Sequence, residues 1–256
     1  MPATLIQPSS VSTTLYFFTP PPDGARAFND ISGVSGRQQK NWESEKHTVE
    51  IENVRGNENS VSLNTTGFQF FLNEPTKHKA FNNDEDIEKE YYPESAELIK
   101  KLTGASRVVF FDHTIRRRVE GETGRDPKKR QPVPQAHVDQ TPLAARNRVL
   151  RHLPESESAE LLNKRFQIIN LWRPIAHAAL DWPLALRDVW GGYNPGQKWK
   201  YLRGMTPDDI VLIKCHDSRE DVARLTPHTA FEDPTTPPDA LPRESIELRS
   251  LVFYDE

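Results

Sequence analysis

The stretch FQIINLWRPI at residues 166–175 decides the predicted fold, because it is a short apolar run that Pro174 ends. Two further runs of this kind follow, DIVLIKCH at 209–216 and ESIELRSLVFY at 244–254. A strand-rich half without alternating helices is typical of an antiparallel sheet rather than of βαβ units. No GxGxxG or P-loop motif occurs, which argues against a nucleotide-binding fold. The sequence therefore predicts an α+β protein with a central antiparallel β-barrel or sandwich.

The N-terminal half mixes strands with helices. Period-two alternation and short apolar runs predict further strands at 13–18, 48–54, 68–72, 107–118 and 198–202. A helix is predicted at 84–92 with Asn83 as its cap, and a second at 93–102, which Gly104 ends. A third is predicted at 142–153, where Thr141 is the cap and Pro142 the first residue, and a fourth at 156–165. Residues 1–11 are expected to form a loose tail, and 1–256 a single domain.

Composition narrows the class of protein. The chain has 256 residues with 33 basic and 37 acidic side chains, so its net charge is 33 − 37 = −4, which argues against nucleic acid as a partner. No apolar run is long enough to span a membrane, and the N-terminus lacks the pattern of a signal peptide. The single cysteine, Cys215, fits the reducing cytosol and is expected to be buried and inert. Because the chain has eight histidines and one cysteine, any metal site is expected to use imidazole and carboxylate ligands rather than thiolates.

The first candidate for chemistry is His137-Val138-Asp139. On an extended segment, residues i and i+2 point to the same face, so this imidazole and this carboxylate can bind one metal ion. The pair by itself is weak evidence, because 8 × 37/256 gives about 1.2 such pairs by chance. His228, 89 residues after Asp139, is the candidate third ligand.

The last predicted strand carries a polar face made of Arg243, Ser245, Glu247 and Arg249. Such a face either contacts solvent or lines a polar cavity, and both interpretations stay open at this point. In a cavity, an arginine with a neighbouring hydroxyl can bind the distal carboxylate of a dicarboxylate.

Asn170, Trp172 and Arg173 are the candidate substrate contacts, because they could project from the strand at 166–172 into the same cavity. The alternative is that Trp172 is plain core and Arg173 only marks a strand end. The cluster Arg116-Arg117-Arg118 is interpreted mainly as solvated surface. No G-x-S-x-G elbow supports a serine nucleophile.

Long blocks of this sequence resemble a known family. They are TGFQFF (66–71), 84–118, AHVDQTP (136–142), RFQIINLWRPI (165–175), HAALDWPLAL (177–186), MTPDDIVLIKC (205–215), TPHTAFEDP (226–234) and PRESIELRSLVFYD (242–255). On these blocks the chain resembles the fungal AsaB-type hydroxylase/desaturase family, and the resemblance as a whole extends from about Thr13 to Asp255. That family groups with the gibberellin-desaturase-like and CmcJ-like proteins.

The resemblance implies a double-stranded β-helix (jelly-roll) core with flanking helices, and a non-haem iron(II) oxygenase of specialised metabolism that uses 2-oxoglutarate and O₂. It implies His137, Asp139 and His228 as iron ligands. Arg243, with Ser245 beside it, is implied as the 2-oxoglutarate anchor, and Arg249 is the rival. The expected substrate is a small amino-acid-like, alkaloid or peptide intermediate. Some members close an aziridine ring, so C–N bond formation joins hydroxylation and desaturation as an expected outcome.

The sequence departs from the family pattern at one place. Members usually carry an extra segment between the WPLAL block and the YNP block, where this chain continues directly near 188–191. A lid over the site would be affected by that difference. Two alternatives to the oxygenase stay open: an iron oxidase that works without 2-oxoglutarate, and a non-catalytic β-barrel that binds a small molecule. The oligomeric state is left undetermined.

Overall fold

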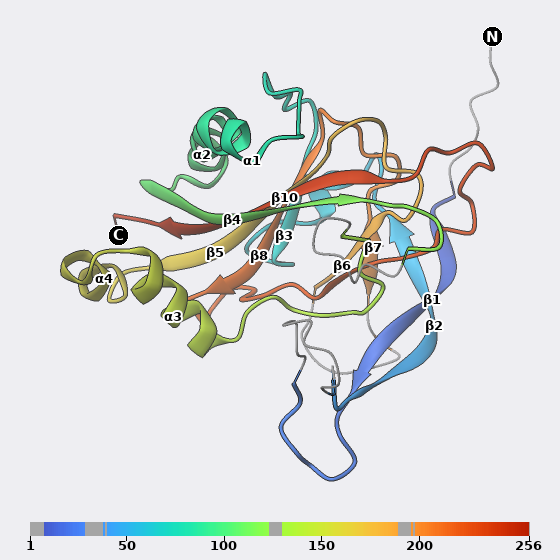
Figure 1. Cartoon of the computed structure of the whole chain (residues 1–256), viewed down its shortest axis with the longest axis horizontal. Helices are drawn as coiled ribbons and strands as arrows, with labels where there is room; N and C mark the ends of the chain where they lie inside the picture. Colours follow the sequence, from blue (N-terminus) through green and yellow to red (C-terminus); the bar gives the residue numbers. More distant parts are fainter. Residues whose placement is uncertain are drawn as a thin grey trace.

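Two five-stranded sheets form the core of the computed structural model, which describes residues 8–28, 38, 40–122, 130–188, 196 and 198–255 (Figure 1). The large, fully antiparallel sheet has the order β3(Phe68–Phe71), β8(Ile210–Asp217), β5(Phe166–Pro174), β10(Glu244–Phe253), β4(Arg107–Arg117). The small sheet has the order β1(Ser10–Thr19), β2(Glu43–Asn53), β7(Trp199–Tyr201), β6(Leu184–Arg187), β9(His228–Ala230). These curled sheets form the predicted jelly roll.

The inner face of the large sheet packs partly against the small sheet. Phe68 and Trp172 of the large sheet belong to one buried cluster with Leu184 and Leu186 of the small sheet. Since side chains alternate along a strand, the odd-numbered neighbours Ile169 and Leu171 of β5 point to the opposite, outer face.

The outer face of the large sheet is covered by a helical segment. It consists of α1(Asp84–Asp86), the π-helical turn η2(Ile87–Tyr91) and α2(Tyr92–Thr103). Asn83 caps its start by accepting a hydrogen bond from the Glu85 backbone, and Gly104 ends it with φ of 75°. The two predicted helices are thus joined by a π turn. Its physical reason is Pro93, whose ring would clash with the carbonyl of Lys89 in a regular α-helix.

Two helices close the other end of the inner face. Thr141 caps α3(Pro142–His152) as predicted, and its hydroxyl accepts from the Ala144 backbone. Together with α4(Glu155–Leu161), this helix packs against β5 and the end of β10. The 3₁₀ turn η1(Glu58–Ser60) lies between β2 and β3. Since α3 begins three residues after Asp139, its capped start lies close in the chain to that carboxylate.

The structure corrects two expectations about elements. Ser10 and Val11, predicted to belong to a loose tail, instead lie in β1 and pair with β2. Strands β6 and β9 were not predicted; each has only three or four residues, too few to show a period. The junction near 188–191 lies outside the described residues from position 189 onward. Within the described part of the chain, no helix has the length and apolarity to cross a membrane.

Candidate metal centre and its cavity

His137 and His228 face each other on neighbouring extended segments. Each donates its backbone N–H to the other's carbonyl oxygen, at 3.2 and 3.0 Å, so both side chains project to one face. The Nδ1 atom of His137 lies 2.7 Å from the Gln135 carbonyl oxygen, and that of His228 lies 3.1 Å from the Thr226 carbonyl oxygen. A carbonyl only accepts, so Nδ1 carries the proton in both neutral rings. Both Nε2 lone pairs are therefore directed to the same point.

Asp139 completes the set. As the i, i+2 spacing predicted, its side chain lies on the face of His137, with Oδ1 3.5 Å from His137 Nε2 and 3.8 Å from His228 Nε2. The three side chains can each offer a ligand atom, and these atoms lie within 4.8 Å of one another. Two imidazoles and one carboxylate on one side of a point are the facial arrangement that suits Fe(II) with open coordination positions.

The electrostatics of these groups prepare them as ligands. Burial alone would raise the pKa of Asp139, but the hydrogen bond from His137 and the charge of Arg249 hold it well below its usual range. Burial, together with the charge of His137, lowers the pKa of His228. Asp139 is thus an anion and His228 a neutral base, the forms in which both bind a metal cation. Although burial disfavours its charge, the hydrogen bond to Asp139 raises the pKa of His137, so this ring must release its Nε2 proton when a metal binds.

The polar face of β10 lines a small cavity, of about 20 Å³, rather than contacting solvent. Arg243 and Ser245 are only 2% and 1% exposed, and Glu247 is also buried. Arg243, Glu247 and Arg249 line the same cavity as His137 and His228. The reason is topological: β10 lies between β5 and β4, and its polar face points inward while Ile246 and Leu248 pack outward.

The two candidate anchoring arginines differ in their partners. Arg243 donates Nη1 to the Trp182 carbonyl oxygen at 2.5 Å and lies over the Trp172 ring, whereas its buried Nε has no hydrogen-bond partner among the described residues. Burial, followed by the nearby charge of Arg116, lowers the pKa of Arg243 to about 9. A buried guanidinium with a free donor is a site for an anion.

The guanidinium of Arg249 already forms ion pairs with carboxylates of the protein. Its Nε, Nη2 and Nη1 atoms lie within 3.0–3.3 Å of oxygens of Asp139, Glu247 and Asp112 respectively. Although burial disfavours its charge, these carboxylates raise the pKa of Arg249 above its usual value. Among the two rivals, Arg243 is therefore the one that offers an uncommitted donor to a cosubstrate.

The three candidate substrate contacts on β5 separate by alternation. Trp172 lines the cavity, and Asn170 lies beside it on the inner face, where its amide contacts Asp139 and Glu247. Arg173 points to the outer face and is 1% exposed. Its guanidinium donates to Tyr91 Oη, to the Glu74 carbonyl and to the Pro207 carbonyl. The prediction that Arg173 contacts the substrate is therefore wrong. Its guanidinium instead links β5 to the helical segment and to the loops that contain Glu74 and Pro207.

One cavity residue was missed. Arg116 lies opposite Ser245 on β4 and lines the cavity, with Nη1 donating to the Gln131 carbonyl at 2.8 Å. Its neighbours Arg117 and Arg118 instead pair with Glu244 and Asp181. Alternation alone separates Arg117 from the other two, but only the pairing of β4 with β10 shows that Arg116 faces the site.

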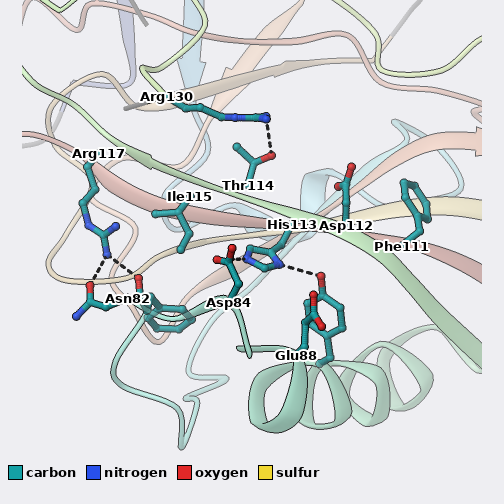
Figure 2. A pocket seen from close by; sticks show the side chains of 12 residues that line it. Asn82, Asp84, Glu88, Phe111, Asp112, His113, Thr114, Ile115, Arg117 and Arg130 are labelled. Atoms are coloured by element: carbon teal, nitrogen blue, oxygen red, sulfur yellow. Dashed lines mark hydrogen bonds and ion pairs between the residues drawn. The ribbon is translucent and has the colours of Figure 1, made fainter. Parts of the chain in front are cut away.

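A second depression lies on the other side of Arg249, between β4 and the α1–η2 segment (Figure 2). It has a volume of about 620 Å³, and none of His137, Asp139 and His228 lines it. Figure 2 shows Asp112 and Thr114 on one side of β4 and His113 on the other, where its ring contacts Tyr92 and Asp84. Arg249 bonds to both Asp112 and Thr114, so its guanidinium separates this groove from the metal ligands.

Cys215 is buried, as predicted. Its sulfur lies 3.9 Å from Asp139 Oδ2, and burial followed by the charge of Asp139 raises its pKa well above the usual value. A thiol that stays protonated is neither a nucleophile nor a metal ligand.

Comparison with known proteins agrees with this geometry. A family model described as "Oxidoreductase/YMDC permease-like domain" matches residues 15–191 and 190–253. The hydroxylase/desaturase efuI of Hormonema carpetanum is 31% identical, over 98% of this chain and 97% of its own length. The Fe(II)/2-oxoglutarate-dependent dioxygenase nvfI of Aspergillus novofumigatus is 31% identical, over 87% of this chain and 89% of its own length.

A solved structure is similar over the whole fold. The iron and alpha-ketoglutarate-dependent endoperoxidase NvfI superimposes with a TM-score of 0.83 at 28% identity, covering 97% of this chain and 99% of its own. The alignment with efuI spans 297 positions, so at least 297 − 256 = 41 of them face a gap in this chain. The two stretches of the family match meet at 190–191, where the sequence departs from the family pattern. With these similarities in sequence and fold, the chain belongs to the AsaB-type family of fungal hydroxylase/desaturases.

Proposed function

We propose that this chain is an Fe(II)/2-oxoglutarate-dependent oxygenase of specialised metabolism. One observation carries the proposal: the metal-ligand set of His137, Asp139 and His228 shares a cavity with the buried guanidinium of Arg243, whose Nε has no hydrogen-bond partner among the described residues. A metal cation and the distal carboxylate of a 2-oxo diacid are the two charges that these groups lack. Fe(II), 2-oxoglutarate and O₂ together supply the oxidation of an unactivated C–H bond.

Each residue has a role that follows from its contacts. His137, Asp139 and His228 would hold the iron, and the carbonyls behind both histidines fix the proton of each neutral ring on Nδ1, so that Nε2 can serve as the ligand atom. Arg243 holds the distal carboxylate of the cosubstrate, while its bond to the Trp182 carbonyl orients the guanidinium. Trp172 covers that guanidinium and keeps water from it.

Arg243 also weighs against the two alternatives. An oxidase that needs no 2-oxo acid would have no use for a buried, unpaired arginine beside its metal, and a binding protein would have no use for the three ligands. The substrate is a small molecule, and an amino-acid-like, alkaloid or peptide intermediate stays our proposal for its class. Hydroxylation, desaturation and C–N ring closure are its proposed outcomes, and the cytosol is the proposed location.

The test uses anaerobically reconstituted full-length protein with Fe(II) and 2-oxoglutarate as probes. We expect about one bound iron per chain and 2-oxoglutarate binding that requires the metal. His137→Ala should lose both, whereas His113→Ala, a histidine of the outer groove, should keep both. Iron binding that survives in His137→Ala would contradict the assignment of the ligands. Metal binding without any affinity for 2-oxoglutarate would favour the cosubstrate-independent oxidase.

A further inference from the structure

We infer that Asn170 and Arg249 are positioning residues that determine which oxygen of Asp139 faces the metal. The inference rests on the proposed metal centre, but it reassigns both residues: Asn170 is not a substrate contact, and Arg249 is not a cosubstrate anchor. It follows from how the two oxygens of one carboxylate are surrounded.

The two oxygens of Asp139 have different neighbours. Oδ1 lies toward His137 Nε2 and His228 Nε2, at 3.5 and 3.8 Å. Oδ2 accepts from Asn170 Nδ2 at 2.7 Å and from Arg249 Nε at 3.3 Å. The protonated Cys215 thiol lies 3.9 Å from the same oxygen. One oxygen is thus surrounded by donors, and the other is left for the metal.

Glu247 holds both donors in place. Its Oε1 accepts from Asn170 Nδ2 at 2.6 Å and lies 3.1 Å from Arg249 Nη2. Asn170 and Arg249 therefore each bridge the same pair of oxygens, Asp139 Oδ2 and Glu247 Oε1. This closed arrangement links β5 and β10, neighbours in the large sheet, to the segment that carries the metal ligand.

The orientation of the Asn170 amide follows from the charges around it. Turning the amide would place its carbonyl oxygen against two carboxylates, which is repulsive. The Nδ2 atom must therefore face Asp139 and Glu247, as it does, and Oδ1 is left buried without a partner among the described residues. An unsatisfied acceptor is the cost of this orientation, which indicates that donation to both carboxylates dominates.

The consequence concerns the number of coordination positions. With Oδ2 occupied by two donors, Asp139 offers a single oxygen to the metal. Three protein ligands then leave half of an octahedron open for other groups. A carboxylate without these donors can turn and is no longer held in the ligand geometry.

The test measures the metal site itself, with Co(II) as the probe on the anaerobically purified, metal-free full-length chain. Asn170→Leu removes the amide at similar volume, and Arg249→Gln removes the guanidinium from the cavity wall. Each variant is expected to bind Co(II) about 10- to 100-fold more weakly, the usual effect of losing an outer partner of a ligand. Each should also change the visible absorption spectrum of bound Co(II), which reports ligand geometry and not global stability.

Two matched variants separate this role from general damage. Gln167→Leu removes another buried amide of β5, one that donates to Asp217 away from the site. Asp112→Asn weakens the outer partner of Arg249 without touching Asp139. Both should keep the wild-type Co(II) affinity and spectrum.

The outcomes distinguish this inference from the proposed function. If the wild-type chain binds no Co(II), the proposed metal centre fails. If it binds Co(II), and both Asn170→Leu and Arg249→Gln match it in affinity and spectrum, the positioning role alone is overturned. Should Asn170→Leu fold poorly, Arg249→Gln decides, because Arg249 lies half-buried at the cavity wall.

Discussion

Arg173 and Arg243 are both buried guanidinium groups of the large sheet, yet their surroundings are opposite. Arg173 points outward, where one hydroxyl and two carbonyl oxygens accept its hydrogen bonds. Arg243 points inward, bonds to one carbonyl and keeps Nε without a partner among the described residues. Burial is thus the same for both, and the satisfaction of donors differs.

The difference separates a structural arginine from a binding arginine. A satisfied guanidinium stabilises the fold and has nothing left for a ligand. An unsatisfied one lowers stability until an anion arrives, and it is retained only where that anion is useful. The four predictions below test this distinction, beginning with the largest expected effect.

Replacing Arg243 by methionine should weaken 2-oxoglutarate binding by about 100-fold or more, because a buried carboxylate that loses its partner costs about 3–5 kcal/mol. Calorimetric titration of the Fe(II)-loaded, anaerobic protein measures it. The free energy of unfolding should change by less than about 1 kcal/mol, since the lost charge had no carboxylate partner. Unchanged 2-oxoglutarate affinity would remove Arg243 from the site.

Replacing Arg173 by methionine should have the reverse pattern. The free energy of unfolding should fall by about 3 kcal/mol, because buried acceptors lose a charged donor. The affinity for 2-oxoglutarate should stay within about twofold of wild type. Urea denaturation and the same titration are the measurements, and a stable variant with weakened cosubstrate binding would restore Arg173 to the cavity.

His216 is a buried histidine whose pKa is lowered mainly by burial. Burial, followed by the charge of Arg224, lowers the pKa of His216 to about 4. In the unfolded chain it titrates near 6.5, so acid favours the unfolded state as the pH falls from about 6.5 toward 4. His216→Gln should remove about 2 kcal/mol of the stability lost between pH 7 and pH 5. Denaturation at both pH values checks this; equal losses in both proteins would show that His216 is not responsible.

The smallest effect is expected at Ser245, which is buried on β10 beside Arg243. If its hydroxyl donates to the distal carboxylate of the cosubstrate, Ser245→Ala should weaken 2-oxoglutarate binding by about 10-fold, the lower end of the usual value for one hydrogen bond to a charged group. The titration used for Arg243→Met detects this change. An effect as large as that of Arg243→Met would mean that the hydroxyl, and not the guanidinium, dominates the anchor.

Much of the fold could be predicted from local patterns. Alternation located β2, apolar runs located β5, β8 and β10, and the Thr141-Pro142 pair located the start of α3. Strands β6 and β9 were not predicted, because three or four residues are too few to reveal the alternation of buried and exposed side chains. The i, i+2 spacing of His137 and Asp139 predicted their common face, but its chance frequency meant that only the family resemblance linked them to His228.

The sequence by itself determined the ligand types, the alternation of each strand and the family. The tertiary structure decided which arginine is free, which is paired with carboxylates and which is structural. The physical reason is that the partners of a guanidinium lie far away in the chain: Glu74 and Pro207 for Arg173, Trp182 for Arg243, Asp112 and Asp139 for Arg249. Hydrogen-bond satisfaction is a property of the packed sheets, and no local pattern encodes it.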